Sequence, residues 1–472
     1  MADQLGNGRR TRHAVVIGGS LAGLLAARVL AEHAERVTVV ERDRFPEGPE
    51  ARPGVPQGRH LHVLLEGGQR ALDELLPGFM DELAELGAPK VGMPGDVVQW
   101  QNGRWFRRTP STTHLFTGAR PQLDWLVRRR VLADPRIETV EGAEVVRLLG
   151  DSSRVRGVLL RERGAGADKE PRPLEADLVV DASGRGSKAP DWLAAIGAEA
   201  PHEESLDTGL AYATRVYRAE PDPKRTDALG CYIMPSPEQA GAAVVLPIGG
   251  GRHIVTLSGL RGDEPPTDET GFEQFAKRLP HPVVADWLAR AEPDSPVFGF
   301  RGTANVRRRY DRPGRRPAGF LATGDALCAF NPIYGQGMST AALSAVALRE
   351  ALADPKRTPS TRRVQRALFG ASKLAWDICL GADRQMPGAT GNVLQGRRTD
   401  KPASWYLDRV LERYVSDPVV GEAFRSVLTL TTPITALFAP EVVRAVLGPV
   451  HDAPTEPPMR REAPGALGAL GA

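Results

Sequence analysis

The sequence predicts an α/β protein in which a parallel-sheet domain is split by an inserted antiparallel β-sheet and followed by a helical region. A strand, a glycine-rich turn, a helix and a second strand follow one another over 14–41. A strand-like pattern occupies about 209–262, and a buried strand followed by a helix returns over 320–353. Strands that alternate with helices favour a parallel sheet, whereas consecutive strands joined by tight turns favour an antiparallel one.

The individual elements follow from local patterns of apolar residues and glycines. In the first part we expect strands at 14–17, 37–40 and 174–182, with a helix over 24–35. Residues 210–216 and 242–257 are strand-like, and three successive glycines at 249–251 supply a hairpin turn. A buried strand at 320–323 and a helix over about 337–353 complete the parallel-sheet domain, and mostly helical sequence continues to about 450.

These elements divide the chain of 472 residues into five segments. The parallel-sheet domain is discontinuous, over 12–205 and 300–350. The antiparallel sheet at 206–299 is expected to cover the substrate, and a helical region at 351–450 to close the pocket. Residues 451–472 are rich in Pro and Gly and are predicted to form a flexible tail.

Charge and cysteine content exclude several classes of protein. Lys+Arg total 61 against 58 Asp+Glu, and a net charge of +3 argues against a nucleic-acid-binding protein. Three cysteines form neither a disulfide framework nor a CxxC metal pair, so we expect a reducing cytoplasm. No run of 18 uncharged apolar residues predicts a membrane span. The uncharged stretch 426–440 could touch a membrane, but its length and Pro433 favour a core or pocket-lining helix.

The turn after the first strand is a GxGxxG-type dinucleotide motif. Gly18 permits the tight turn, Gly23 permits close packing of the helix, and the small residue Ser20 stands where the middle glycine is usual. The helix N-terminus presents N–H groups to a pyrophosphate. Glu41, 23 residues after Gly18, is placed to bind a ribose hydroxyl and would repel a 2′-phosphate. The motif therefore favours FAD or NAD over NADP.

A second motif separates FAD from NAD. Asp325 ends a strand and can bind a ribityl hydroxyl, which NAD lacks. The glycine-rich segment that follows, with Gly335 and Gly337, can point N–H groups at the flavin ring. A third strand and turn, over 176–187, is expected to bring another loop near the dinucleotide.

These three segments in this order resemble the FAD-dependent monooxygenases of the p-hydroxybenzoate-hydroxylase fold, over nearly all of 13–350. The resemblance implies a Rossmann-like FAD-binding domain and NAD(P)H as electron source, direct or through a flavin reductase. Aromatic hydroxylases of this fold have Asp-Gly where this chain has Ser183-Gly184, so tight NADPH recognition does not follow from that motif.

A narrower resemblance is to the polyene epoxidases of polyether-antibiotic biosynthesis, of the lasalocid and monensin type, which are squalene-epoxidase-like. The segment GVPQGRHLHVL at 54–64 carries it, together with 212–215, 246–252, 329–335 and 453–458. It implies that Arg120 contacts the FAD ribose or pyrophosphate, that Val145 lies near adenine, and that Arg59 lies over the flavin-side loop. The full predicted cofactor-binding set is Gly18, Gly19, Ser20, Gly23, Glu41, Arg42, Arg59, Arg120, Val145, Asp325, Gly335 and Gly337.

The expected function is epoxidation of C=C bonds in an apolar, polyketide-like polyene, through a flavin C4a-hydroperoxide. The cofactor carries this chemistry, so no catalytic side chain is assigned; Arg59 and His60 are the nearby candidates. His60 and His62 lack an evident third ligand, and we expect no metal. Partners would be the polyene, O₂ and either a flavin reductase or a carrier protein. The alternatives are a hydroxylase or a geranylgeranyl-type alkene reductase on the same scaffold, or a non-redox lipid-binding protein. A flavin halogenase is disfavoured because its WxWxIP signature is absent.

Overall fold

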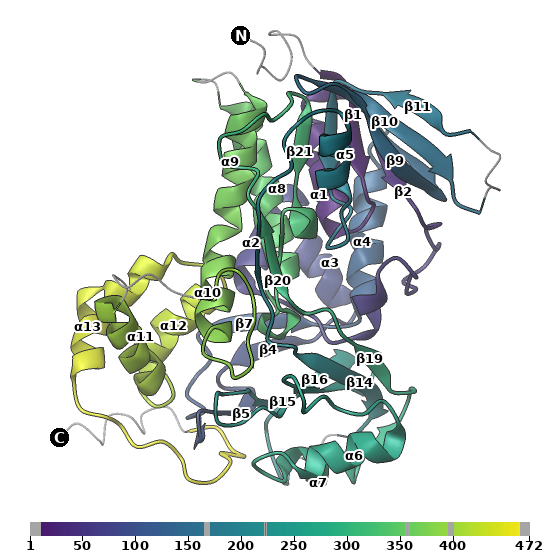
Figure 1. Ribbon diagram of the computed structural model, residues 1–472. Helices are drawn as coiled ribbons and strands as arrows, with labels where there is room; N and C mark the ends of the chain where they lie inside the picture. Colours follow the sequence, from purple (N-terminus) through teal and green to yellow (C-terminus); the bar gives the residue numbers. More distant parts are fainter. Residues whose placement is uncertain are drawn as a thin grey trace.

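The computed structural model describes residues 11–164, 170–220, 222, 224–354, 356, 359–394 and 401–462. Figure 1 shows three regions: a parallel-sheet part with its helices, a large antiparallel sheet below it, and a group of C-terminal helices beside both. Each region has its own buried hydrophobic cluster.

The parallel sheet has five strands in the order β21-β12-β1-β2-β8, all paired in parallel. Its strands are β1 (Thr11–Ile17), β2 (Ala34–Glu41), β8 (Ile137–Glu141), β12 (Leu178–Asp181) and β21 (Phe320–Ala322). One face packs on a small antiparallel sheet, and the other on α1, which also contacts α4 and α8. The small sheet consists of β9 (Ala143–Gly150), β10 (Val155–Glu162) and β11 (Arg172–Glu175).

The helices and short elements of this part surround the parallel sheet. The helices are α1 (Leu21–Leu30), α2 (Glu66–Leu75), α3 (Phe79–Glu85), α4 (Arg120–Leu132), α5 (Ala189–Ala195), α8 (Gly337–Ala353) and α9 (Thr361–Ala371). Single turns of 3₁₀ helix lie at η1 (Pro56–Arg59), η2 (Gly324–Ala326) and η3 (Pro332–Tyr334). Two three-stranded sheets join the regions: β3 (Val63–Leu64), β7 (Thr113–Thr117) and β4 (Lys90–Met93), and β13 (Glu203–Leu206), β20 (Asn305–Arg308) and β22 (Cys328–Ala329).

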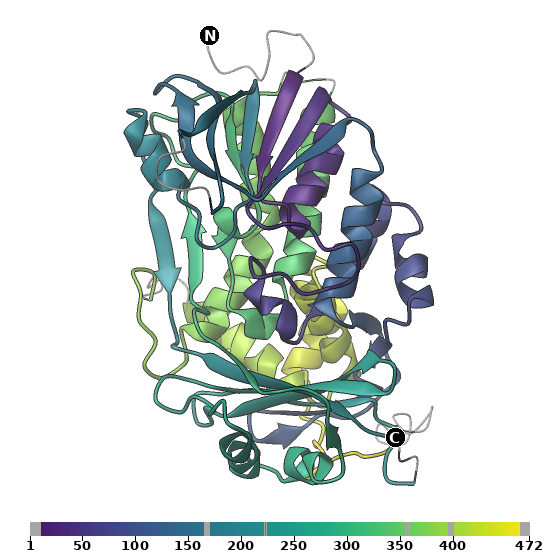
Figure 2. The same ribbon diagram turned by 90° about the vertical axis from the view of Figure 1, so that its right-hand side faces the viewer.

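The large sheet has eight strands and spans the lower part of the molecule in Figure 2. It contains β14 (Ala211–Arg218), β15 (Gly230–Ile233), β16 (Ala242–Gly249), β17 (Arg252–Gly259), β18 (Glu292–Pro293) and β19 (Phe298–Phe300), and α6 (Glu269–Lys277) and α7 (Val283–Leu288) cover its outer face. The sheet extends beyond the predicted 206–299, because β5 (Val97–Gln101) pairs in parallel with β15 and β6 (Arg104–Trp105) follows β5.

Several sequence-based predictions of single elements are confirmed and two are corrected. The helix at 337–353 and the hairpin at 249–251 occur as predicted. The helix predicted over 24–35 instead begins at Leu21 and ends at Leu30, because the chain enters β2 at Ala34. The strand predicted over 174–182 is two strands, β11 and β12, which belong to different sheets.

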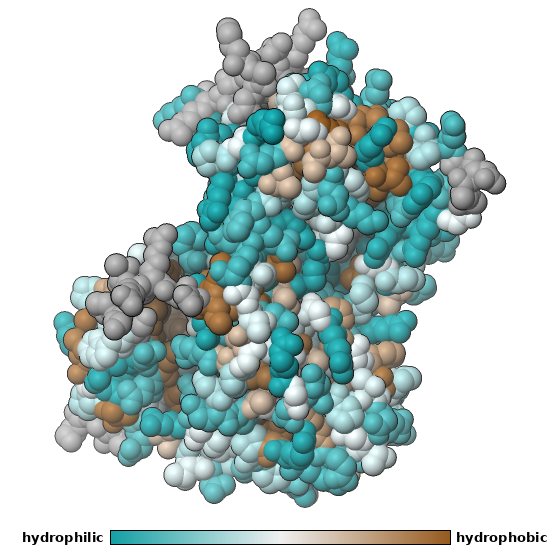
Figure 3. Space-filling model, in the orientation of Figure 1, coloured by the Kyte–Doolittle hydropathy of each residue, from teal (hydrophilic) through white to brown (hydrophobic). Residues whose placement is uncertain are grey.

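The C-terminal helices are α10 (Lys373–Asp383), α11 (Lys401–Arg413), α12 (Pro418–Leu428) and α13 (Pro440–Leu447), with a 3₁₀ turn η5 (Ile434–Phe438). Within the uncharged stretch 426–440, Val427 and Leu437 are buried while Ile434 and Phe438 are exposed. On the face shown in Figure 3, hydrophilic side chains predominate and hydrophobic ones lie in separate patches. In the part of the chain that the structure describes, every helix is too short or too polar to cross a bilayer.

Residues 451–462 pack on the large sheet rather than forming the free tail predicted for 451–472. Met459 packs against the cluster beneath the sheet. Arg108 donates to the carbonyl of Pro458 (3.1 Å), and Arg107 pairs with Glu462 (2.8 Å). The rest of the predicted tail, 463–472, lies outside the described residues.

Candidate functional site: a dinucleotide cradle beside an aromatic pocket

The turn between β1 and α1 is closed so tightly that only glycine fits at two positions. Gly18 has φ +100°, and a Cβ there would lie 2.6 Å from the carbonyl oxygen of Ala182. A Cβ on Gly23 would lie 1.8 Å from the carbonyl oxygen of Gly18. No side chain caps the first turn of α1. The arrangement leaves the N-terminus of a buried helix open to an anionic group.

Glu41 at the end of β2 is held against this turn. Its carboxylate accepts hydrogen bonds from the backbone N–H of Gly19 (2.8 Å) and of Asp43 (2.9 Å). The buried guanidinium of Arg52 lies 3.2 Å from the same carboxylate and donates to the carbonyl of Gly19 (3.2 Å). An acidic group is therefore fixed beside the turn, where the sequence predicts the ribose to bind.

Arg120 also reaches the turn, and its predicted contact with the FAD ribose or pyrophosphate stays a prediction. It begins α4, is buried, pairs with Asp124 (2.7 Å) and lies with Nη2 3.4 Å from the Ser20 hydroxyl oxygen. Two other predicted cofactor residues lie outside the turn. Val145 is buried in β9 with its side chain in the core, and Arg42 is exposed and donates to the carbonyl of Gly54 (3.3 Å). Their roles toward a nucleotide remain predictions.

The second predicted motif meets the first. Gly324 lies so close to α1 that a Cβ there would be 2.6 Å from Cβ of Ala22. Asp325 follows in η2, where burial raises the pKa of its carboxyl and the nearby Arg185, Arg120 and Arg308 oppose that rise. Gly335 has φ +65° and lies against Val63. No side chain caps α8, and a Cβ on its first residue, Gly337, would meet open space.

The third predicted segment, 176–187, contacts the flavin-side segment. Asp181 ends β12 fully buried and accepts hydrogen bonds from the backbone N–H and hydroxyl of Ser183 and from the hydroxyl of Ser187. Arg185 then donates to the backbone carbonyls of Ala304 and Phe330. The predicted loop is thus fixed directly before the flavin-side segment, although its individual contacts could not be read from the sequence.

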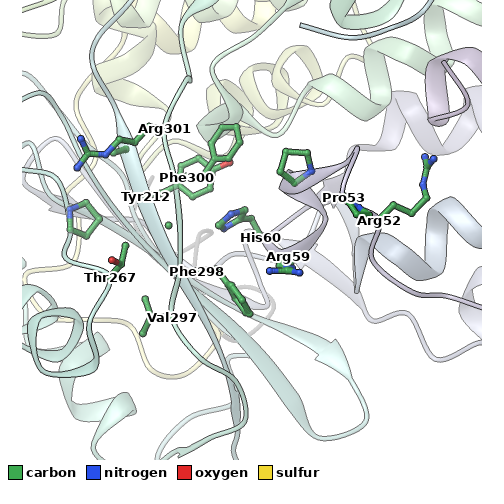
Figure 4. Close-up of a pocket in the computed structure, with 14 residues that line it drawn as sticks. Arg52, Pro53, Arg59, His60, Tyr212, Thr267, Val297, Phe298, Phe300 and Arg301 are labelled. Carbon is green, nitrogen blue, oxygen red and sulfur yellow. The ribbon is translucent and has the colours of Figure 1, made fainter. Parts of the chain in front are cut away.

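A cavity of about 700 Å³ lies between the loop that carries η1 and the large sheet. Figure 4 shows His60 at its centre, with Tyr212 and Phe300 beside it and Arg59 next to Phe298. The rings of Tyr212 and Phe300 are stacked with centroids 5.3 Å apart, and the Arg59 guanidinium is 5.1 Å from the Phe298 ring centroid. Ile333 of η3 packs into the same apolar cluster as Tyr212 and Phe300. The pocket therefore adjoins the flavin-side segment.

Both histidines of the predicted segment are neutral near pH 7. Burial, reinforced by Arg59, lowers the pKa of His60 to about 4; burial, reinforced by Arg120, lowers the pKa of His62 to about 3. Nδ1 of His60 lies 2.9 Å from the Thr214 hydroxyl, and Nδ1 of His62 donates to the carbonyl of His60 (3.0 Å). Within the described ranges, His, Cys, Asp and Glu form no group able to hold a metal ion.

Sequence reasoning missed several side chains that shape the site. Arg52 completes the contacts of Glu41, Phe298 and Phe300 form a pocket wall, and Asp383 contacts the flavin-side segment from α10. None of them belongs to a motif with fixed spacing. For Tyr212 the sequence does hold a signal, because it lies in the stretch 212–215 that carries the narrower resemblance.

The cradle fits FAD. The strand–turn–helix opening at Gly18–Gly23 with Glu41 and Arg120 beside it suits an adenosine diphosphate, and the open start of α8 after Asp325 suits the ribityl and flavin portion. Both halves lie at the ends of parallel strands β1, β2 and β21, where such sheets bind nucleotides.

Comparison with known proteins agrees with this assignment. The FAD binding domain family matches residues 11–367. A Mycobacterium tuberculosis protein, Rv3254, is 34% identical over 90% of this chain and 90% of its own length. Kynurenine 3-monooxygenase of Salinispora tropica is 29% identical over 76% of this chain and 77% of its own length. Mouse squalene monooxygenase is 25% identical over 72% of this chain and 54% of its own length. The structure of a flavin-dependent brominase superposes with a TM-score of 0.62 at 15% identity, covering 88% of this chain and 93% of the other.

The chain therefore belongs to the FAD binding domain family of flavin-dependent monooxygenases. Its cofactor is FAD, and NAD(P)H is the reductant typical of the family. The predicted fold class, a mixed α/β FAD-binding fold, is confirmed.

Proposed function

We propose that this flavin monooxygenase epoxidises C=C bonds of an apolar, polyketide-like polyene. The observation that carries the proposal is the pocket beside the flavin-side segment, whose walls include Tyr212, Phe298, Phe300 and Val297. An extended apolar chain can lie against these rings and lose its hydration there. Similarity to squalene monooxygenase, whose name specifies an apolar polyene, supports this substrate class.

The protein's own residues would bind and orient the substrate and would exclude water from the site. When bound and reduced, FAD would supply the activation of O₂ and an electrophilic oxygen atom. Stacked Tyr212 and Phe300 would hold the alkene on the side of the cavity nearest Ile333, and neutral His60 beneath them adds no charge. Orientation and exclusion of water are then the main contributions of the chain to the reaction.

A second candidate is hydroxylation of an aromatic substrate that carries an anionic group. Arg59 and Arg301 line the pocket, and none of the lining residues is Asp or Glu. Kynurenine 3-monooxygenase of Salinispora tropica is similar over three quarters of this chain. A guanidinium recognises a carboxylate well, so the pocket's charge favours this candidate while its apolar walls favour the first.

The test is turnover of the FAD-loaded protein with ¹⁸O₂ and a model polyene, with NADPH alone and with an added flavin reductase. Mass spectrometry and NMR of the product identify what was added and where. Epoxide oxygens derived from ¹⁸O₂ support the proposal, and the two electron sources show whether the chain accepts NADPH directly. A saturated product without oxygen would contradict it in favour of an alkene reductase. A ring-hydroxylated product from an aromatic acid, with no turnover of polyenes, would favour the second candidate.

A further inference from the structure

A buried carboxylate contacts the flavin-side segment from the C-terminal helices. Asp383, the last residue of α10, is 2% exposed. Its Oδ2 accepts from the side-chain amides of Asn305 (2.6 Å) and Asn331 (3.0 Å), and its Oδ1 accepts from the Tyr334 hydroxyl (2.6 Å). These three partners are neutral. Burial raises the pKa of the Asp383 carboxyl, and the three hydrogen bonds, rather than a cation, oppose that rise.

The orientation of both amides is fixed independently of Asp383. Oδ1 of Asn305 accepts from the backbone N–H of Asn331 (2.7 Å), and Oδ1 of Asn331 accepts from the backbone N–H of Ile333 (3.2 Å). Each amide therefore has to turn its NH₂ group toward Asp383. With two donors on Oδ2, the carboxylate serves as an acceptor at that oxygen, and the tyrosine hydroxyl is free to donate to the other.

The same helix holds the other end of the segment. Cys379 lies one turn before Asp383 on α10, and its thiol donates to the side-chain oxygen of Gln336 (3.3 Å). Gln336 is 1% exposed and directly precedes Gly337, the first residue of α8. Hydrogen bonds from α10 thus fix Asn331, Tyr334 and Gln336, which span the segment 331–337 that the FAD cradle requires.

We propose that Asp383 is a positioning residue for the flavin: it fixes the segment 331–337 and places a buried negative charge behind it. The proposal rests on FAD binding by this family and is independent of the substrate. A fixed segment keeps the open N–H groups at the start of α8 aligned for the cofactor. A buried charge is poorly screened, so it opposes the negative charge that reduction adds to the flavin.

The test uses the full-length, FAD-loaded Asp383→Asn protein. The substitution keeps the shape of the side chain, but it removes the charge and places an NH₂ group against the Tyr334 hydroxyl. We expect the FAD dissociation constant to rise roughly tenfold, as for loss of a hydrogen bond to a charged group. The midpoint potential of the bound flavin should become more positive, because the negative charge is gone. The visible flavin absorption bands should shift. A purely structural role for Asp383 would leave the potential unchanged.

Asp377→Asn is the matched control, because Asp377 lies on the exposed side of the same helix and pairs with Lys373 in the preceding turn. Its dissociation constant should stay within about twofold of the original and its potential should not move. Equal shifts in both variants, or a folded Asp383→Asn protein with unchanged FAD affinity and potential, would overturn the proposal.

Tyr334→Phe provides a second route should Asp383→Asn fail to fold. It removes only the hydrogen bond to Oδ1 and leaves the amide contacts in place. We expect a rise of about threefold in the FAD dissociation constant, since one neutral hydroxyl donor is lost. The midpoint potential of the flavin should become more negative, because the carboxylate keeps its charge but loses the hydrogen bond that partly offset it. A dissociation constant and potential equal to those of the original protein would contradict the proposal.

Discussion

The cofactor cradle and the substrate pocket lie side by side and share Arg52, but most of each is built from a different part of the chain. The cradle depends mainly on the backbone: at Gly18 and Gly23 there is no room for a Cβ, and N–H groups at helix starts face the ligand beside the side chains of Glu41, Arg120 and Asp325. The pocket depends on side chains, with Tyr212, Phe298 and Phe300 on strands β14 and β19.

This difference shows why one half of the site can be assigned to a family and the other cannot. A backbone cradle tolerates few residue types at fixed spacing, so it recurs in the same form in Rossmann-like dinucleotide-binding domains. Side chains on a sheet face can change without disturbing the strand that carries them. The identity of the substrate therefore depends on the more variable half.

The largest effect is expected from a change to the backbone cradle. Gly23→Ala places a methyl group 1.8 Å from the carbonyl oxygen of Gly18, so the helix or the turn must move. We expect destabilisation of about 3 kcal/mol and a protein purified without FAD. Denaturant unfolding and the flavin-to-protein absorbance ratio measure the two effects. Gly370→Ala, at an exposed position of α9, is the control, because a Cβ there meets nothing within 4 Å; equal behaviour of the two variants would contradict the close-packing argument.

A change to the pocket should affect the substrate and spare the cofactor. Phe300→Ala removes one ring of the stacked pair with Tyr212. We expect KM for the polyene to rise about tenfold, in line with the loss of one apolar side-chain contact, while FAD affinity stays within threefold. Steady-state kinetics and flavin titration separate these quantities. Phe438→Ala, at an exposed ring on the C-terminal helices, should change neither; loss of FAD from Phe300→Ala would show that the two halves are not separable.

His60, at the centre of the pocket, should make the free energy of unfolding depend on pH. Because the folded pKa of His60 is about 4 and the ordinary value is 6.5, the unfolded chain binds the proton more readily. The contribution of neutral His60 is present above pH 6.5 and is lost as pH falls toward 4.

His60→Gln should therefore flatten the fall in unfolding free energy between pH 6.5 and 4, by about 1.4 kcal/mol per pH unit at most. Denaturant unfolding at several pH values measures this slope. His202→Gln, at an exposed position, serves as the control and should keep the original slope. An unchanged slope in His60→Gln would mean that His60 is not held neutral in the fold.

The smallest effect is expected at the exposed edge of the pocket. Arg301 lines the cavity but is exposed, so Arg301→Gln should change KM for an uncharged polyene by less than about threefold. If the second candidate function holds, the same variant should show a larger rise in KM for a substrate that carries a carboxylate. Steady-state kinetics with the neutral and anionic compounds side by side decide between them.

Prediction from the sequence succeeded where a residue type is constrained by its immediate neighbours. The predicted turns contain Gly18, Gly23 and Gly335, and the predicted helix spans 337–353. Tight turns and helix starts restrict backbone geometry over only a few residues, so local sequence predicts them. It was incomplete where pairing is long-range. Nothing near 97–105 indicates that β5 and β6 join a sheet otherwise formed by 211–300, since strands from distant parts of the chain pair only when the protein packs.

The sequence by itself determined the cofactor class, the position of the dinucleotide turn and the order of the α/β and antiparallel parts. Only the tertiary structure brought Asp383 to Asn331 and Asn305, 52 and 78 residues earlier in the chain, and assembled the pocket from η1, β14 and β19. The physical reason is that backbone constraints act between neighbours in the chain. Contacts between distant side chains exist only after helices and sheets have packed, when buried polar groups must find partners.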